Sequence, residues 1–197
     1  GQMVVDLCAG AGGKTLALGA LMHSTGRIYA FDVSERRLVN LRPRLARSGL
    51  QNVHPQRIAS ERDTRVKRLA GKIDRVLVDA PCSGLGTLRR NPDLKLRQTP
   101  QSVAELRIKQ TSILDAAASL LKPGGRLVYA TCSLLAEENQ DVVAAFLKKH
   151  PDYALSNAQE VLKRQRIDIS SPGDFLELWP ADHGTDAFFA AVLERTA

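Results

Sequence analysis

Short apolar runs alternate along the chain with longer segments whose apolar residues recur at helical spacing. The apolar runs predict strands at residues 3–7, 26–33, 53–58, 73–80, 126–131 and 186–195. The segments between them predict a Gly-rich turn and helix within 9–24, helices at 34–49 and 102–121, a short basic helix after residue 58, and a helix at 136–150. Residues 81–100 are expected to form a long loop, and residues 151–183 show a less regular pattern.

This alternation predicts an α/β fold with a doubly wound, mostly parallel sheet that has helices on both faces. Pro43 lies within the predicted helix 34–49 and is expected to kink it. Such sheets bind ligands beyond the carboxyl ends of their strands, at the switch point in strand order. Cys82 and Cys132 follow the fourth and fifth predicted strands, so both are expected to face the binding cleft.

The loop CAGAGGKT, Cys8 to Thr15, follows the first predicted strand and has three interpretations. In a nucleoside-binding turn, glycines let a ligand approach the backbone, and an acid about 20 residues on binds ribose hydroxyls. Asp32 stands at that spacing from Gly10. In a phosphate-binding P-loop, Gly13-Lys14-Thr15 fits but Cys8 replaces the first glycine. That replacement and Asp32 favour the nucleoside-binding turn, and a tight turn with a purely structural role is the third interpretation.

Two of the cysteines are candidates for nucleophilic chemistry. A thiolate in a cleft is reactive when cationic neighbours or a helix terminus lower its pKa. Cys132 lies shortly before the helix predicted from Ala136, and Cys82 lies ahead of Arg89 and Arg90. A single free cysteine is more often an inert buried residue. Two at matching strand ends, beside a predicted cofactor site, favour chemistry.

The composition indicates an anionic partner and a reducing compartment. The chain has 197 residues, is 44% hydrophobic, and carries a formal charge of +7. Arginines and lysines cluster at 36–47, 62–68 and 89–97, and nucleic acid is the first candidate partner for them. Three cysteines are too few for a disulfide framework, which favours the cytoplasm.

Other classes of protein are disfavoured by what the pattern lacks. No apolar run approaches the ~18 residues of a membrane span. Cys8 ends a strand at the same edge as the other two thiols, but without a CxxC pair or ligand-spaced histidines we expect no metal site. Nothing in the pattern indicates an obligate protein partner.

The chain resembles the RsmB/Sun/Fmu (NOL1/NOP2/Sun) family of RNA (cytosine-5) methyltransferases in the segments VVDLCAGAGGKTLAL, DRVLVDAPCSGLGTLRRNPDLKLR, GGRLVYATCSLLAEEN and GTDAFFAAVLER. The resemblance runs from the first residues to the last and implies the Rossmann-like class I methyltransferase fold, dependent on S-adenosylmethionine. One antiparallel strand near the C-terminus is expected, with 186–195 as its candidate. We expect residues 1–197 to be a single catalytic domain and a fragment, because the chain enters a strand at once without an initiator Met and the family's preceding RNA-recognition domain is absent.

The resemblance also implies residue roles. Cys132 matches the family's nucleophile, Cys82 the second cysteine that assists release of the methylated base, and Asp79 the acid near the cofactor and target base. The S-adenosylmethionine loop corresponds to Cys8, Ala9, Gly10, Ala11, Gly12, Gly13 and Lys14, with Asp32 as the ribose-binding acid and Asp79 as a further cofactor contact. Lys14 is also expected to reach the target cytosine. The family's adenine-binding acid falls within RIASERDT, where Ser60 stands at the expected place with Glu61 and Asp63 nearby, so that contact stays unassigned.

The implied chemistry requires these residue types. Carbon 5 of cytosine becomes nucleophilic only after a thiolate adds to carbon 6, and a protonated Asp79 at ring nitrogen 3 would stabilise the developing charge. The Pro81-Cys82 dipeptide alone suggests Cys82 as the attacking thiol, as in DNA cytosine methyltransferases, whereas the whole-chain resemblance favours Cys132. The expected substrate is RNA, with ribosomal RNA first. The alternatives are a P-loop nucleotide hydrolase and a catalytically inactive RNA-binding module on the same fold.

Overall fold

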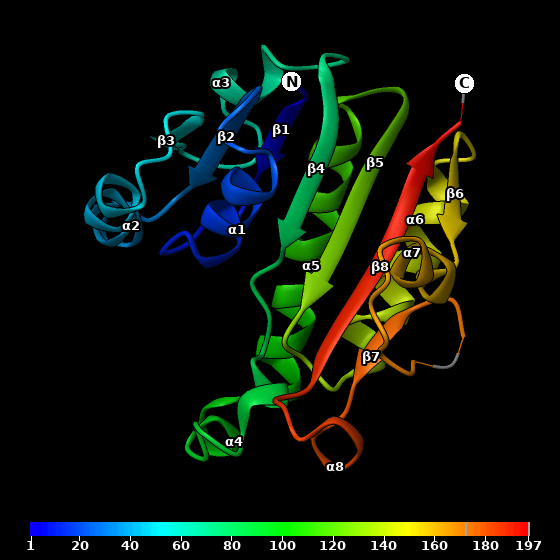
Figure 1. Cartoon of the computed structure of the whole chain (residues 1–197). Helices are drawn as coiled ribbons and strands as arrows, with labels where there is room; N and C mark the ends of the chain where they lie inside the picture. Colours follow the sequence, from blue (N-terminus) through cyan, green and yellow to red (C-terminus); the bar gives the residue numbers. More distant parts are fainter. Residues whose placement is uncertain (172, 197) are drawn as a thin grey trace.

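Five parallel strands form the first part of one sheet in the computed structural model, which describes residues 1–171 and 173–196. They are β1 (Met3–Asp6), β2 (Arg27–Asp32), β3 (Val53–Arg57), β4 (Ile73–Asp79) and β5 (Leu121–Thr131). Along the sheet they lie in the order β3-β2-β1-β4-β5, so the order reverses between β1 and β4 (Figure 1). Parallel strands place their carboxyl ends at one edge, and the switch point at that edge is where such sheets bind ligands.

The C-terminal strand confirms the predicted antiparallel element. Strand β8 (Phe188–Arg195) pairs antiparallel with β5. Its other edge pairs with β6 (Tyr153–Ser156) near Arg195 and with β7 (Leu176–Leu178) near Phe188, again antiparallel. The mostly parallel, mixed sheet that the sequence predicts is therefore present, and β8 carries its start to the edge where the parallel strands end (Figure 1).

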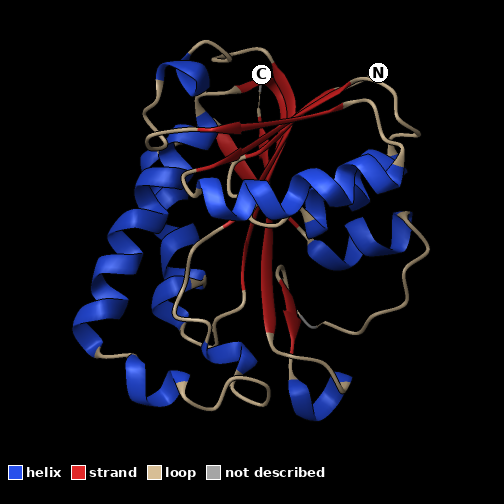
Figure 2. Cartoon of the chain, turned by 90° about the vertical axis from the view of Figure 1, so that its left-hand side faces the viewer, coloured by secondary structure: helices blue, strands red, loops and turns tan. Residues whose placement is uncertain are grey.

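Helices cover both faces of the sheet, as an edge-on view shows (Figure 2). On one face, α1 (Gly13–Leu21) and α2 (Glu35–Ser48) pack over β1 and β2, with Leu38 and Leu41 of α2 buried against Ile28. On the other face lie α3 (Thr64–Lys67), α5 (Pro100–Ala118) and α6 (Gln140–Lys149). The two apolar clusters enclose the sheet, as expected for strands that are apolar on both sides.

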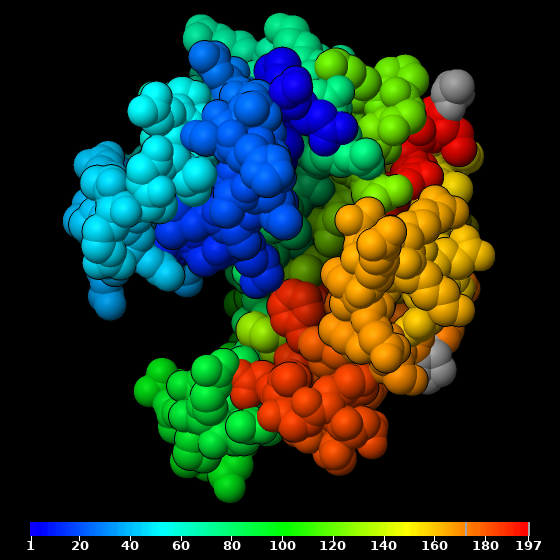
Figure 3. All heavy atoms as spheres, viewed as in Figure 1, coloured from blue at the N-terminus to red at the C-terminus, as the bar shows by residue number. Residues whose placement is uncertain are grey.

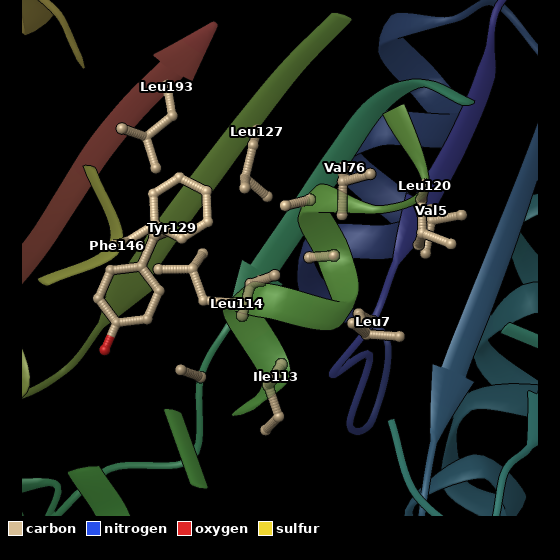
Figure 4. Packing of buried hydrophobic residues seen from close by; sticks show 14 of the residues in the cluster. Val5, Leu7, Val76, Ile113, Leu114, Leu120, Leu127, Tyr129, Phe146 and Leu193 are labelled. Carbon is tan, nitrogen blue, oxygen red and sulfur yellow. The ribbon is translucent and has the colours of Figure 1, made fainter. Parts of the chain in front are cut away.

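The larger cluster fixes α5 and α6 against the strands that precede the two cysteines. Leu114 of α5 and Phe146 of α6 pack around Tyr129 of β5, and Val76 of β4 lies further along the same cluster, near Leu120 (Figure 4). Tyr129, Leu114 and Phe146 are almost wholly buried. Since close-packed interiors resist shifts of their elements, the ends of β4 and β5 are held in a fixed relation to each other.

Two segments contain more structure than the sequence predicts. The expected loop 81–100 includes a 3-10 turn, η1 (Leu85–Thr87), and a short helix, α4 (Leu94–Arg97). The less regular segment 151–183 includes β6, α7 (Ala158–Arg164), β7 and α8 (Pro180–His183). These elements span only three to seven residues each. Hydrophobic periodicity cannot be read over so few positions.

Two predicted boundaries differ from the structure, and one helix runs on through its proline. Helix α5 ends at Ala118 and β5 begins at Leu121, so residues 122–125 lie inside the strand, where its register with β4 shifts. The predicted helix 136–150 divides into η2 (Ala136–Glu138) and α6, separated at Asn139. Helix α2 continues through Pro43 as one helix. In the described part of the chain, no helix has the length and apolar character needed to cross a membrane.

Candidate active site

A cavity of about 670 Å³ opens at the carboxyl ends of β1, β2, β4 and β5. The space-filling view shows the molecule hollowed between the blue N-terminal segment and the green α4 segment (Figure 3). The predicted site residues that line the cavity are Cys8, Ala9, Gly10, Ala11, Gly13, Lys14, Asp32, Asp79, Cys82 and Cys132. A second cavity, of about 820 Å³, lies along α5 and is lined by none of the predicted site residues.

The glycine loop is held by Asp32. The Gly10 N–H donates to Asp32 Oδ2 at 2.8 Å, and the Ser34 N–H donates to Asp32 Oδ1 at 2.7 Å. Gly12 does not line the cavity, but its φ of 82° begins α1, and a Cβ there would lie 2.0 Å from Leu41 Cδ1. Only glycine fits that combination of left-handed backbone and close packing. Each Asp32 oxygen keeps a lone pair that a ligand hydroxyl can use.

Asp6 belongs to the site although the sequence analysis did not select it. It ends β1, lines the cavity, and accepts a hydrogen bond from the Thr15 hydroxyl at 2.6 Å. Both side chains are almost fully buried, and burial raises the pKa of Asp6 to about 6. The other oxygen, Oδ1, has no hydrogen-bond partner among the described residues. A polar residue at the end of an apolar strand was the signal available in the sequence.

Lys14 and Asp79 form an ion pair across the cavity. Lys14 Nζ lies 2.7 Å from Asp79 Oδ2, and both side chains are partly exposed. The same ammonium lies 5.0 Å from the centre of the Phe188 ring, within the range of a cation–π interaction. Phe188, at the start of β8, is a second residue that sequence reasoning missed, because its place beside Lys14 depends on the antiparallel pairing of β8.

The two candidate thiols are in contact. Cys82 Sγ and Cys132 Sγ lie 3.4 Å apart, and both side chains are partly buried. A hydrogen bond from Cys82 lowers the pKa of Cys132 to about 7, outweighing burial and the charge of Asp79, and Lys14 acts in the same direction as Cys82. The same hydrogen bond, together with burial, raises the pKa of Cys82. The lowered pKa of Cys132 and the raised pKa of Cys82 favour a thiolate at Cys132 and a proton on Cys82.

The groups expected to lower the thiol pKa values, two arginines near Cys82 and a helix terminus near Cys132, are not the ones found. Arg90 forms an ion pair with Asp186, and Arg89 Nε lies 3.6 Å from Asp186 Oδ1, so both arginines are engaged away from the thiols. The helix expected from Ala136 begins as a 3-10 turn of three residues rather than as a full helix. At Cys132 the neighbouring thiol, rather than a helix terminus, is the main cause of the lowered pKa, and its proximity was not visible in the sequence.

The two acidic residues after β3 have different surroundings. Asp63 accepts hydrogen bonds from the N–H groups of Ala59 and Arg65 and caps the start of α3. Its carboxylate is therefore used within its own loop. Glu61 lines the cavity, and its Oε1 accepts the Ser112 hydroxyl at 2.6 Å. Glu61 is thus the acid of this segment that faces the cavity, as Lys109 does from α5.

Cys8 differs from the other two thiols. Burial, reinforced by the charges of Asp6 and Asp32, raises its pKa, so it stays protonated. Within residues 1–171 and 173–196, no group of three or more His, Cys, Asp or Glu side chains is arranged to hold a metal ion.

The strand order, the glycine turn and the acid at the end of β2 define a class I methyltransferase dependent on S-adenosylmethionine. Within that class, the chain belongs to the family described as 16S rRNA methyltransferase RsmB/F, whose profile matches residues 1–194.

Curated relatives agree with this assignment. The probable ribosomal RNA small subunit methyltransferase B of Synechocystis sp. is 40% identical over 194 residues, which cover 98% of this chain and 43% of the relative. The protein of the same description from Bacillus subtilis is 34% identical over 200 residues, again covering 98% and 43%. The chain thus spans less than half the length of these relatives.

A solved structure has the same fold. NSun6 from Pyrococcus horikoshii, crystallised with SFG, an analogue of S-adenosylmethionine, superposes with a TM-score of 0.85 at 30% identity. The match covers all of this chain and 48% of that protein.

Proposed function

We propose that this domain transfers the methyl group of S-adenosylmethionine to carbon 5 of cytosine in RNA, with the small-subunit ribosomal RNA as the first candidate substrate. The observation that carries the proposal is the contact of Cys82 and Cys132, 3.4 Å apart, on the cavity that Lys14 and Asp79 also line. A nucleophilic thiolate, a second proton-carrying thiol and an ion pair are the groups that this reaction needs.

The residues present fit the cofactor. Gly10 and Gly12 have positive φ angles that let a ligand approach the backbone, and Asp32 offers its remaining lone pairs to ribose hydroxyls. We assign Glu61 to the adenine side of the cavity, because it is the acid after β3 that lines it. When bound, S-adenosylmethionine supplies the methyl group as an electrophile.

Cys132 begins the reaction. Its thiolate forms a bond to carbon 6 of the cytosine, and the ring electrons move toward the ring nitrogen and oxygen, which makes carbon 5 nucleophilic. The Lys14 ammonium, held by Asp79 at 2.7 Å, is placed to donate to the charged edge of the ring. The Asp79 carboxylate, paired with Lys14, accepts a hydrogen bond from the amino group of the base. The target base must leave its stack to reach these groups.

Cys82 completes the reaction. While Cys132 is a thiolate, the Cys82 thiol donates a hydrogen bond to it and stays protonated. Once Cys132 is a thioether, Cys82 no longer faces a negative sulfur, and it gives its proton to solvent in the cavity to become a thiolate. Its thiolate then takes the proton from carbon 5, and the bond between Cys132 Sγ and carbon 6 breaks to restore the aromatic ring.

The site fits neither alternative function. A P-loop hydrolase requires an accessible Thr hydroxyl for magnesium, whereas the Thr15 hydroxyl is buried on Asp6, and Lys14 is paired with Asp79. An inactive RNA-binding module would have no use for two thiols in contact on the cofactor cavity.

We further propose that residues 1–197 are one catalytic domain of a longer protein. The relatives in which the chain covers 43% of the length support this, and selection of the RNA then falls to the remaining parts. The cytoplasm is the proposed location, because ribosomal RNA is accessible there and three unpaired thiols stay reduced.

Transfer of a labelled methyl group to unmodified small-subunit ribosomal RNA tests the reaction, and bisulfite sequencing locates the product. We expect one or a few cytosines to become 5-methylcytosine in ribosomal RNA from cells that carry the gene and to be unmodified in cells that lack it, with transfer RNA analysed in parallel. Calorimetry should detect binding of S-adenosylmethionine and none of ATP with magnesium. Binding of ATP alone, or methylation unaffected by loss of the gene, would overturn the proposal.

A further inference from the structure

A buried carboxylate lies behind the two thiols. Glu138, the last residue of η2, is 0% exposed. Its Oε1 accepts the Ser83 N–H at 2.8 Å and the Gln110 side-chain amide at 3.0 Å. Its Oε2 accepts the hydroxyls of Ser83 and Ser133. Four donors from three separate segments therefore converge on one side chain.

The two serines directly follow the two cysteines. Ser83 is next to Cys82 in the loop after β4, and Ser133 is next to Cys132 in the loop after β5. The serine hydroxyls also lie 3.2 Å from each other. The Glu138 carboxylate thus binds both cysteine loops at the residue adjacent to the sulfur-bearing one.

Glu138 is itself held firmly. The Tyr129 hydroxyl donates to the Glu138 carbonyl at 2.6 Å, and Gln110 connects the carboxylate to α5. A direct backbone bond joins the same loops, since the Gly86 N–H donates to the Cys132 carbonyl at 2.9 Å. The carboxylate is therefore a fixed point relative to the packed core rather than a mobile side chain.

Stability alone does not explain this arrangement. None of the ion pairs among the described residues includes Glu138. A carboxylate buried without a cation costs free energy that apolar packing would not. Charge-assisted hydrogen bonds, however, are short and directional, and fix geometry more strictly than neutral ones. The cost of burying this carboxylate and the directional hydrogen bonds that it accepts both favour a role in positioning the loops.

We propose that Glu138 is a positioning residue that keeps the thiols of Cys82 and Cys132 at contact distance. The inference rests on the proposed function and adds to it the residue that holds the Cys82 thiol within hydrogen-bond distance of the Cys132 thiol. When the carboxylate is lost, the two loops can separate, the hydrogen bond between the sulfurs lengthens, and the pair no longer shares a proton.

The proximity of the thiols can be measured without RNA or cofactor. In a glutathione redox buffer, the two thiols react with one oxidised glutathione to give the Cys82–Cys132 disulfide and two reduced glutathiones, so two electrons pass from the protein to the oxidant. The equilibrium constant reports how closely the protein holds the pair. Peptide mass spectrometry identifies this link and excludes mixed disulfides at Cys8.

The chain offers a matched pair of variants. Glu138→Gln replaces one carboxylate oxygen by an NH2 group, so that one of the two pairs of donors on this side chain loses its acceptor, while Glu137→Gln makes the same change at the exposed neighbour. We expect Glu138→Gln to lower the disulfide equilibrium constant at least tenfold and to raise the pH midpoint of Cys132 alkylation. Glu137→Gln should stay within twofold of the unsubstituted chain on both measures. Equal values for Glu138→Gln and Glu137→Gln would overturn the proposal.

A second variant tests the proposal if Glu138→Gln does not fold. If Glu138→Gln is not folded by circular dichroism, Ser133→Ala removes only one donor and leaves the other three bonds to the carboxylate. It should lower the equilibrium constant in the same direction, by about threefold or more, and an unchanged constant would count against the proposal. A shift in the thiol equilibrium, together with ribosomal RNA methylation that is unaffected by loss of the gene, would refute the proposed function alone.

Discussion

Cys82 Sγ and Cys132 Sγ lie 3.4 Å apart although fifty residues separate them along the chain. The contact follows from the sheet, because Asp79 of β4 pairs in register with Ala130 of β5 and the two cysteines come shortly after these residues. Two equivalent thiols so close together become unequal, since one proton shared between them makes one sulfur the donor and the other the anion.

The first prediction concerns the roles of these two sulfurs. Cys132→Ser should abolish methyl transfer and form no covalent adduct with RNA, because no thiolate remains to attack carbon 6. Cys82→Ser should instead accumulate a protein–RNA adduct, because the attack still occurs but removal of the carbon 5 proton fails. Denaturing gel electrophoresis with labelled RNA and S-adenosylmethionine detects the adduct.

Cys8→Ser is the matched control for these variants, because Cys8 is the third thiol on the cavity and its raised pKa keeps it unreactive. It should form no stable adduct. An adduct that accumulates in Cys132→Ser and is absent in Cys82→Ser would reverse the assigned roles.

The second prediction is a pH dependence. Alkylation by iodoacetamide requires the thiolate, so the rate at Cys132 should rise with pH through a midpoint near its pKa of about 7. Cys82→Ala removes the hydrogen bond that lowers this pKa, and the midpoint should move up toward the ordinary thiol value of about 8.5. Rates are measured by mass spectrometry of the peptide that carries residue 132.

Cys82→Ser separates the hydrogen bond from the sulfur itself. Its hydroxyl can still donate to the Cys132 thiolate, so the midpoint should stay nearer to that of the unsubstituted chain than to that of Cys82→Ala. Identical midpoints for the unsubstituted chain and Cys82→Ala would show that the contact between the sulfurs does not set the pKa.

The hydrophobic pattern predicted the parallel sheet and the positions of both cysteines at strand ends, and the family resemblance implied the antiparallel β8. Contacts between segments that lie far apart in the sequence could not be predicted. The pairing of Phe188 with Lys14 and of Glu138 with both cysteine loops depends on how β8 and η2 fold back over the strand ends. No spacing in the chain encodes such a contact.

Two expectations failed at the level of single residues. Residues 122–125, a pattern typical of a turn, lie inside β5 as an irregular stretch: the register with β4 passes from Ile73 opposite Leu121 to Arg75 opposite Arg126, and Gly124 has a φ of 73°. The arginines expected to act on Cys82 pair with Asp186, a residue that the sequence places almost one hundred positions away. Charge clusters predict an anionic partner for the chain but not which individual carboxylate each arginine meets.

The third prediction concerns the cofactor loop. Asp32→Asn places an amide group against one of the two N–H groups, of Gly10 or Ser34, that the carboxylate accepts. Leaving one buried donor unpaired should lower the free energy of unfolding by about 1–3 kcal/mol. Because the loop that would hold the cofactor is displaced as well, the affinity for S-adenosylmethionine should fall at least tenfold in calorimetry.

Glu35→Gln is the control for Asp32→Asn, because Glu35 lies three residues further on and is exposed on α2. Its affinity and stability should stay within error of those of the unsubstituted chain. Unchanged affinity in a folded Asp32→Asn variant would remove Asp32 from the cofactor site.

The fourth prediction links Asp6 to stability. Burial raises the pKa of Asp6 from 3.8 to about 6, so between these values the folded chain binds a proton that the unfolded chain has lost. The free energy of unfolding contributed by this group therefore falls as pH rises from about 4 to 6, by about 3 kcal/mol at most. Asp6→Asn removes the titration while its amide oxygen still accepts the Thr15 hydroxyl. Urea unfolding should show the variant to be more stable at pH 8 and little changed at pH 4.

Asp74 provides a control of opposite sign. It accepts the Met3 N–H at 2.7 Å, and that bond, with the Lys122 ammonium, lowers its pKa. A lowered pKa contributes stability that is present above the unfolded value and is lost as pH falls, so Asp74→Asn should destabilise the chain at pH 8 and progressively less toward acid. Parallel curves for Asp6→Asn and the unsubstituted chain between pH 4 and 8 would mean that folding does not raise the pKa of Asp6. The carboxylate would then have a compensating partner in the cavity.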